Sequence, residues 1–278
     1  MKKFIVRTLA GALFAAVLIG AILYGAKTFT MLFVPFTALT LEELCVLLKK
    51  HRNTTFNTQL TMVCGVLLFF AFAAMNYFES VSVVLLFAPY IIAVVYMFIS
   101  RLFSAKGNAL EDYAYFALTQ IYVALPFSLL NVLSTVGTTE GEAYSWVIPL
   151  SIFIFIWCND SGAFCVGCTI GRHKMFERVS PKKTWEGFVG GVVVAAVAGV
   201  VMSRFLTVMN VWQWVGMALV VAVAGTLGDL VESSMKREMQ IKDSGNFLPG
   251  HGGFLDRFDS TLLAVPAVVV YLALLCIL

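Results

Sequence analysis

Apolar residues run along the chain in long blocks, and short polar stretches separate these blocks. A helix needs about 20 apolar residues to cross the hydrocarbon core of a membrane. Nine blocks approach or reach that length, and they cover residues 7–25, 28–47, 59–78, 81–100, 113–135, 146–170, 187–207, 211–230 and 260–278. The sequence therefore predicts an all-α, polytopic integral membrane protein with about nine transmembrane helices.

The positions of the basic residues predict the orientation of these helices. Of the 19 lysines and arginines, only Lys27 and Arg204 fall in outer loops when the N-terminus lies inside and nine helices cross. Inner loops of membrane proteins carry an excess of these residues. We therefore expect an N-in, C-out topology, which puts the polar blocks 171–186 and 231–259 on the cytoplasmic face.

Composition agrees with a chain that spans the membrane as one domain. Hydrophobic residues make up 60% and charged residues 13% of the sequence, whereas a soluble protein carries about 25% charged residues. No fixed-period repeat, long linker or soluble segment is visible, so we expect a single membrane domain over residues 1–278. We interpret residues 1–135 as a supporting half and residues 136–278 as a catalytic half with a cytoplasm-facing polar cavity.

Acidic residues recur at helical spacing around the last polar block. Asp256 and Asp259 lie three positions apart, which places both carboxylates on one face if the segment from Phe254 is helical. Asp229 and Glu232 repeat that spacing just upstream. Charges beside apolar spans are costly unless they face water, a partner or a bound ion. Two acidic pairs around a basic, glycine-rich loop therefore indicate a site for divalent metal and phosphate rather than an ordinary solvated loop.

The other polar block begins inside an apolar run. Asp160, flanked by Asn159 and Ser161, predicts a helix that is broken where it lines a water-filled cavity. Further along, Ser180 before Pro181 predicts a helix N-cap with proline in the first helical position.

Basic and hydroxyl side chains follow this predicted N-cap. Lys182, Lys183 and Thr184, next to exposed helix amides, would suit an anionic phosphate chain. For Arg172 and Arg178, topology and attraction to anionic lipid headgroups explain the charge equally well.

Two stretches of these blocks have long, gapped patterns. Ser233 to Asp259 reads S-x-M-K-R-x4-K-D-x-G-x2-L-P-G-H-G-G-F-L-D-R-F-D, and Asp160 to Gly187 contains G-R and S-P-K-K-T-x-E-G. Together with the membrane plan, they resemble the CDP-diacylglycerol synthases (phosphatidate cytidylyltransferases) over essentially the whole chain. Phe164 departs from the family pattern, in which a tyrosine is common there. The resemblance implies an enzyme that condenses CTP with phosphatidic acid to give CDP-diacylglycerol and pyrophosphate for phospholipid biosynthesis.

The resemblance also implies roles for individual residues. Both reactants are polyanions, so catalysis should consist mostly of charge neutralisation and alignment. We expect Mg²⁺, with a second cation as an open alternative, and its predicted ligands are Asp229, Glu232, Asp256 and Asp259. The predicted catalytic residues are Asp229, Asp256, Asp259 and Lys183. The predicted substrate-binding residues are Asp160, Arg172, Ser180, Lys182, Lys183, Thr184, Glu186, Lys236, Arg237, Lys242, Gly250, His251, Gly252 and Gly253.

These roles define the expected partners and location. We expect CTP, phosphatidic acid and the lipid bilayer as partners, and no nucleic acid, in a bacterial-type inner membrane with the active site facing the cytoplasm. The small residues from Gly187 to Gly199 leave a homodimer open. Cys165 and Cys168 have the spacing of a metal or redox pair but lack a second pair and a histidine partner, so we assign them no role.

Three other classes of protein compete with this interpretation. A secondary transporter would use Asp160, Asp229 and Asp256 as ion-coupling groups, but it would be expected to show inverted repeats, and none is visible. A CDP-alcohol phosphotransferase would carry D-x2-D-G before A-R and a later D-x3-D, an order that is absent here. A structural scaffold does not need acids at the edges of apolar runs. The transporter remains the alternative function.

Overall fold

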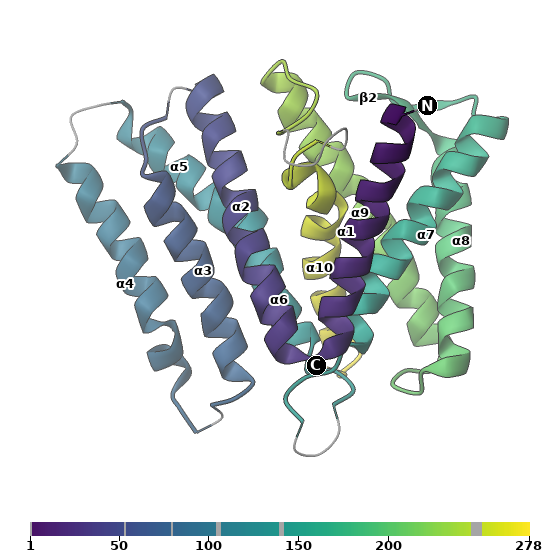
Figure 1. Cartoon of the computed structure of the whole chain (residues 1–278), viewed down its shortest axis with the longest axis horizontal. Helices are drawn as coiled ribbons and strands as arrows, with labels where there is room; N and C mark the ends of the chain where they lie inside the picture. Colours follow the sequence, from purple (N-terminus) through teal and green to yellow (C-terminus); the bar gives the residue numbers. More distant parts are fainter. Residues whose placement is uncertain (1, 53, 79, 104–106, 139–141, 246–251) are drawn as a thin grey trace. The chain divides into compact units, whose positions relative to one another are not determined.

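The described part of the chain consists mostly of helices, with a small β-hairpin between α7 (Val147–Ile170) and α8 (Trp185–Phe205) (Figure 1). The computed structural model describes residues 2–52, 54–78, 80–103, 107–138, 142–245 and 252–278. The elements are α1 (Lys2–Tyr24), α2 (Ala26–Arg52), α3 (Thr58–Met75), α4 (Val83–Leu102), α5 (Ala109–Thr119), the π-helical turn η1 (Gln120–Ala124), α6 (Leu125–Leu133), α7 (Val147–Ile170), β1 (Lys174–Phe176), β2 (Ser180–Thr184), α8 (Trp185–Phe205), α9 (Val211–Glu238) and α10 (Leu255–Leu274).

The helices confirm the predicted all-α, polytopic membrane protein. Within the described residues, eight helices are long and apolar enough to cross a membrane, namely α2, α3, α4, the continuous run Ala109–Leu133, α7, α8, α9 and α10. The Leu9–Tyr24 part of α1 is also apolar. Large apolar side chains such as Val84, Leu85 and Ile92 on α4 are 72%, 66% and 67% exposed, as expected for a surface that faces lipid. The N-in, C-out orientation stays a prediction.

Contacts within the chain group its residues into two compact units. The first unit comprises Met1–Thr135, Gly141–Tyr144 and Asp243–Arg257, and the second comprises Val136–Glu140, Ser145–Lys242 and Phe258–Leu278. The first turn of α10 therefore belongs to the first unit and the rest of that helix to the second. The supporting and catalytic roles assigned to residues 1–135 and 136–278 stay predictions.

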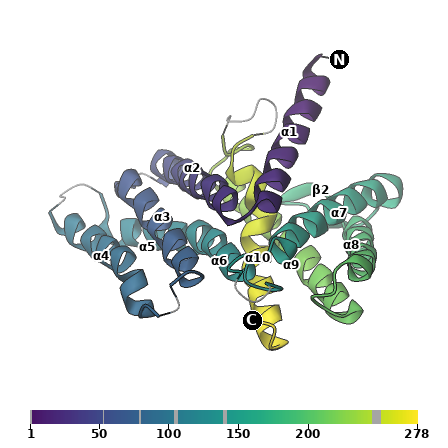
Figure 2. The ribbon, with the colours of Figure 1, turned by 60° about the horizontal axis from the view of Figure 1, so that its bottom comes forward.

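The first unit has an aromatic core and a buried ion pair. Helix α3 packs against both α2 and α4 (Figure 2), and the Phe29 and Phe69 rings stack with centroids 6.5 Å apart. Arg101 Nε lies 2.7 Å from Asp112 Oδ2, with both side chains almost fully buried. The same carboxylate accepts hydrogen bonds from Thr55 N and Thr55 Oγ1. Buried charges are stable only when paired in this way, so the pair fixes the connection before α3 against the start of α5.

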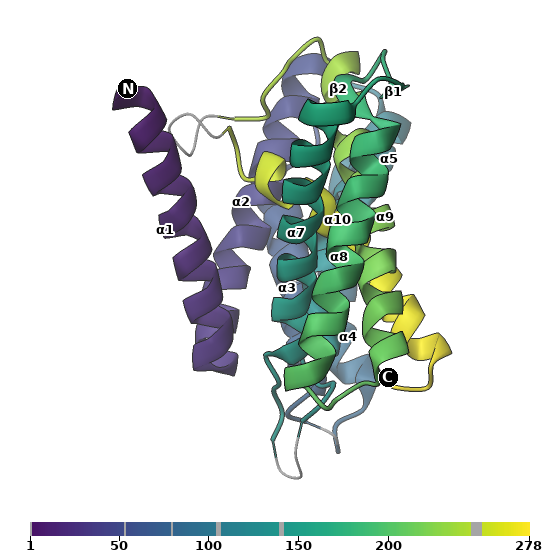
Figure 3. The ribbon, with the colours of Figure 1, turned by 90° about the vertical axis from the view of Figure 1, so that its right-hand side faces the viewer.

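The second unit is built around close packing of α7, α8 and α9 (Figure 3). A Cβ atom on Gly187 would lie 2.9 Å from the Ala163 carbonyl oxygen, and one on Gly191 would lie 2.6 Å from the Asn159 carbonyl oxygen. Gly199 packs in the same way against the carbonyl oxygen of Trp214. The small residues that suggested a dimer surface thus let helices of one chain approach each other. A homodimer stays a prediction, and these glycines do not support it.

Candidate active site

A cavity of about 360 Å³ lies within the second unit, among α7, the hairpin, the start of α8 and α9. Its polar lining consists of Asn159, Asp160, Lys182, Lys183, Thr184, Thr226 and Asp229. Apolar side chains line the rest, among them Phe164, Met175 and Phe188. The structure therefore brings together five predicted site residues from α7, β2 and α9, namely Asp160, Lys182, Lys183, Thr184 and Asp229.

Helix α7 carries Asn159 and Asp160 into this cavity without a break. The predicted interruption is wrong, because α7 continues from Val147 to Ile170. The buried Asn159 instead finds a partner on a neighbouring helix, since its Nδ2 donates to Thr226 Oγ1 at 3.3 Å. A polar pair across two helices needs no unwound backbone, so the cavity-lining part of the prediction holds while the helix stays intact.

The predicted helix start at Ser180 is also wrong. Residues Ser180–Thr184 form strand β2, which pairs antiparallel with β1, and proline tolerates this extended conformation. Helix α8 begins four residues later than predicted, and its N-cap is Thr184, whose Oγ1 accepts a hydrogen bond from Gly187 N at 3.2 Å. Lys182 and Lys183 consequently project from a strand at the cavity rather than from a helix.

Glu186, predicted to bind substrate, holds the connection between α7 and β1. Its carboxylate accepts hydrogen bonds from Arg172 N at 3.1 Å and His173 N at 3.2 Å, and it lies 2.5 Å from His173 Nδ1. The Arg172 side chain itself is exposed. These contacts stabilise the entrance to the hairpin, so substrate binding by Glu186 and Arg172 stays a prediction.

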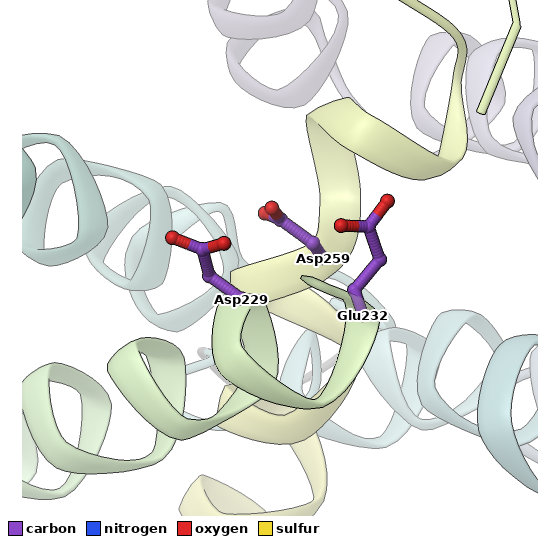
Figure 4. Close-up of side chains that lie close together, drawn as sticks. All are labelled: Asp229, Glu232 and Asp259. Carbon is purple, nitrogen blue, oxygen red and sulfur yellow. The ribbon is translucent and has the colours of Figure 1, made fainter. Parts of the chain in front are cut away.

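Three carboxylates meet where α9 crosses α10. Asp229 and Glu232 lie one turn apart on α9, and Asp259 reaches them from α10 (Figure 4). One oxygen from each of these carboxylates lies within 4.8 Å of the others. Ser233 Oγ donates to Asp229 Oδ1 at 3.2 Å, and Asp259 Oδ1 accepts from Ser260 N at 2.6 Å. The predicted helical spacing therefore produces a real cluster of oxygen atoms.

Two lysines pair with this cluster. Lys183 Nζ lies 2.6 Å from Asp229 Oδ2, and Lys236 Nζ lies 2.5 Å from Glu232 Oε2 on a carboxylate that is fully buried. Lys183 also lines the cavity, so it joins the cavity to the carboxylates.

The donor set fits a hard divalent cation. Among the described residues of this region, Asp160, Asp229, Glu232 and Asp259 supply four carboxylates, whereas Lys182, Lys183 and Lys236 supply three ammonium groups. Unbalanced negative charge is costly beside apolar helices, and carboxylate oxygens are the ligands that Mg²⁺ prefers. Asp229, Glu232 and Asp259 therefore have both the chemistry and the spacing to hold it.

Two predicted residues of the last polar block, Asp256 and Gly253, are joined by a hydrogen bond. Asp256 belongs to the first unit, where its Oδ2 accepts hydrogen bonds from Ser244 N at 3.0 Å and Gly253 N at 2.9 Å. Gly252 has φ +79°, a conformation that glycine adopts without strain. Gly250 and His251 lie outside the described residues.

The predicted basic residues of the last block differ in their surroundings. Arg237 donates from Nε to Val179 O at 3.3 Å and from Nη1 to Ile241 O at 3.0 Å, so it links the end of α9 to the hairpin. Lys242 is exposed, and the half-buried Lys236 is the ion-pair partner of the buried Glu232. Their predicted contacts with substrate stay predictions.

Comparison with known proteins decides the family of the chain. The model of the cytidylyltransferase family matches residues 5–275. The chain belongs to this family. The phosphatidate cytidylyltransferase of Bacillus subtilis (strain 168) is 32% identical over 276 residues, which cover 96% of this chain and 97% of that protein. The proteins of the same name from Staphylococcus aureus (strain COL) and Staphylococcus epidermidis (strain ATCC 12228 / FDA PCI 1200) are each 38% identical over 162 residues, covering 58% of this chain and 59% of the relative.

Three polar residues of this cytidylyltransferase-family protein were not predicted as site residues. Asn159 and Thr226 line the cavity and bond to each other, and Glu43 of α2 contacts the segment before α10. The sequence signal for Glu43 was present, because it lies at the edge of an apolar run as Asp229 does. Nothing in the sequence indicated which residues Glu43 contacts.

Proposed function

We propose that this membrane protein transfers the cytidylyl group of CTP to phosphatidic acid, giving CDP-diacylglycerol and pyrophosphate. Family membership over nearly the full chain supports the class of reaction. The observation that carries the proposal for this chain is Lys183, which lines the cavity and pairs with Asp229 of the carboxylate cluster. One basic group could therefore serve both a phosphate chain in the cavity and a cation at the carboxylates.

The reaction joins a water-soluble polyanion to a lipid phosphate. A phosphate oxygen of phosphatidic acid attacks the α-phosphorus of CTP, the new P–O bond forms as the bond to the β-phosphate breaks, and pyrophosphate leaves. Lys182 and Lys183 neutralise the phosphates and orient them by charge-assisted hydrogen bonds. The lipid phosphate is already ionised, so no general base is required. The apolar lining at Phe164, Met175 and Phe188 suits the lipid part of that substrate.

We further propose that Asp229, Glu232 and Asp259 hold Mg²⁺. When bound, Mg²⁺ would neutralise phosphate charge and template the two reactants. Lys236 pairs with the buried Glu232 carboxylate and holds it in place. The predicted ligand role of Asp256 remains part of the proposal, although its carboxylate also holds two backbone amides. A second cation remains an open alternative.

We place the protein in a bacterial-type inner membrane with this site facing the cytoplasm. The inner loops carry all the basic residues except Lys27 and Arg204 when the N-terminus is inside. CTP is a highly charged cytoplasmic metabolite, so the opposite orientation would separate it from the site.

Turnover by purified protein tests the proposed function. Protein in detergent micelles that contain phosphatidic acid should convert CTP to CDP-diacylglycerol and pyrophosphate when Mg²⁺ is present. Removal of Mg²⁺ by EDTA should abolish the reaction, and added Mg²⁺ should restore it. Wild-type protein that is monodisperse but does not consume CTP under these conditions would refute the proposal and favour the transporter.

A further inference from the structure

Glu43 of α2 contacts a segment that follows it by about 200 positions in the chain. Its Oε2 accepts a hydrogen bond from Phe254 N at 2.6 Å, and its Oε1 accepts one from Ser244 Oγ. A Cβ atom on Gly245 would lie 2.9 Å from Glu43 Oε1, and one on Gly253 would overlap the carboxylate. Glycines at these two positions therefore let the backbone approach the partly buried carboxylate closely.

Asp256 also holds this segment. It accepts hydrogen bonds from Ser244 N and Gly253 N, while Glu43 accepts from Ser244 Oγ and Phe254 N. Two carboxylates thus hold Ser244 through its hydroxyl and its amide, and they hold the consecutive amides of Gly253 and Phe254. We call these five residues, all in the first unit, the carboxylate clamp.

The arrangement exceeds what a helix start requires. The first amides of a helix lack internal acceptors, and a carboxylate in the first turn commonly satisfies one of them. Asp256, in the first turn of α10, instead accepts from Gly253 N, two residues before the helix. Glu43 adds a second carboxylate from a distant helix, at a position from which solvent is partly excluded. Charge-assisted hydrogen bonds of this kind fix geometry more firmly than a local cap.

We propose that Glu43 is a positioning residue for the cytidylyl transfer. By holding Ser244 and Phe254, it fixes the residue at which α10 begins and the rotation of its first turn about the helix axis. Asp259 lies five residues beyond Phe254 in the same segment, so the direction of its carboxylate depends on that start. Mg²⁺ demands near-ideal ligand geometry, and small misplacements of a catalytic group cost large factors in rate. The inference rests on the proposed function.

The test compares Glu43→Ala and Glu43→Gln with Glu42→Ala. Glu42 is the adjacent residue on α2, has the same side chain and is exposed, so it is a matched control. Glu43→Ala should lower kcat and raise the Mg²⁺ concentration for half-maximal rate, each by roughly tenfold, because it loses hydrogen bonds to a charged acceptor. Glu43→Gln should be milder, since its amide oxygen can still accept the Phe254 amide. Glu42→Ala should match wild type.

Amide hydrogen exchange gives a readout that does not depend on turnover. Exchange at the Phe254 amide, which donates to Glu43, should be faster in Glu43→Ala and unchanged in Glu42→Ala. Should Glu43→Ala fail to fold, Glu43→Gln and Ser244→Ala keep the test open, and their effects on the Mg²⁺ requirement should be non-additive in the double variant because both act on one contact.

The outcomes separate the positioning role from the proposed function. Wild-type protein without CTP turnover would refute the proposed function and the positioning role with it. An active wild type, with Glu43→Ala equal to Glu42→Ala in kcat, Mg²⁺ requirement and amide exchange, would refute the positioning role alone. A lower melting temperature in Glu43→Ala with unchanged kcat and Mg²⁺ requirement would also refute it, because the contact would then serve stability only.

Discussion

Replacing Lys183 by methionine perturbs the junction between the cavity and the carboxylate cluster. Methionine keeps most of the length of the side chain and removes the ammonium group that lies 2.6 Å from Asp229 Oδ2. The two side chains are 26% and 33% exposed, and an ion pair at this exposure contributes about 0.2–1 kcal/mol to stability. We therefore expect Lys183→Met to fold, with only a small decrease in melting temperature.

The expected effect on catalysis is larger than the effect on stability. If Lys183 binds a phosphate, losing that charge-assisted hydrogen bond costs about 1.5–3 kcal/mol, which corresponds to a roughly tenfold to hundredfold lower kcat/KM. Lys183 also competes with a cation for Asp229, so its removal should lower the Mg²⁺ concentration for half-maximal rate. A slower enzyme with a smaller Mg²⁺ requirement is an unusual combination, and general damage to the fold would not produce it.

Steady-state kinetics with CTP and phosphatidic acid over a Mg²⁺ titration measure both effects. Lys182→Met is the matched comparison, because Lys182 lines the same cavity but is exposed. It should weaken substrate use without lowering the Mg²⁺ requirement. Wild-type kinetics in Lys183→Met would show that this lysine is only a topology signal. Recovery of activity in a Lys183→Met, Asp229→Asn double variant would show that Lys183 serves only to pair with Asp229, and either result would refute the reasoning.

Three further predictions follow from the geometry. Asp259→Asn can still accept a hydrogen bond from the Ser260 amide but removes a charge from the cluster, so the rate and the Mg²⁺ affinity should both fall by about a hundredfold, with partial rescue by Mn²⁺. Glu177→Gln, at an exposed position, is the control. A Mg²⁺ titration of Asp259→Asn that matches wild type would contradict the metal assignment. Cys165 and Cys168 are both exposed, but only Cys168 is among the residues that line the cavity. Bound CTP should therefore slow maleimide labelling of Cys168 several-fold and leave the labelling of Cys165 unaffected. Equal protection of both cysteines would place the nucleotide outside this cavity. In whole cells, an impermeant maleimide should label Thr207→Cys and leave Arg178→Cys unlabelled until permeabilisation, and the reverse pattern would overturn the orientation.

Local rules explain why the membrane helices and the acidic cluster were predictable. Span length depends only on consecutive apolar residues, and each predicted block overlaps a helix or, for 113–135, the continuous run Ala109–Leu133. The three-residue spacing of Asp229 and Glu232 needs only helical geometry to place their carboxylates one turn apart. That Asp259 joins them follows from the packing of α9 against α10, which the sequence did not specify. The cluster contains Asp229, Glu232 and Asp259 but not Asp256, and the metal-binding role of all four stays a prediction.

The two errors have a common physical cause. Ser180-Pro181 is a good local start for a helix, but strand pairing with residues 174–176 holds it extended and moves the N-cap to Thr184. Asn159-Asp160 looks like a break in a span, yet Thr226 on another helix satisfies the Asn159 amide, and α7 continues. In both cases a partner that is distant in sequence decided the conformation. Local propensity has no access to such partners.

The same dependence on distant partners bears on where this protein is sensitive to substitution. Glu43 is separated from Ser244 by 201 positions, and Lys183 reaches the Thr226 carbonyl oxygen 43 positions away. These polar groups are stabilised by a partner on another element, and an unpaired polar group costs several kilocalories per mole beside lipid. Removing one partner therefore leaves the other with an unmet charge or hydrogen bond. We consequently expect losses of activity to follow such contacts across the chain rather than to be confined to the two polar blocks that identify the family.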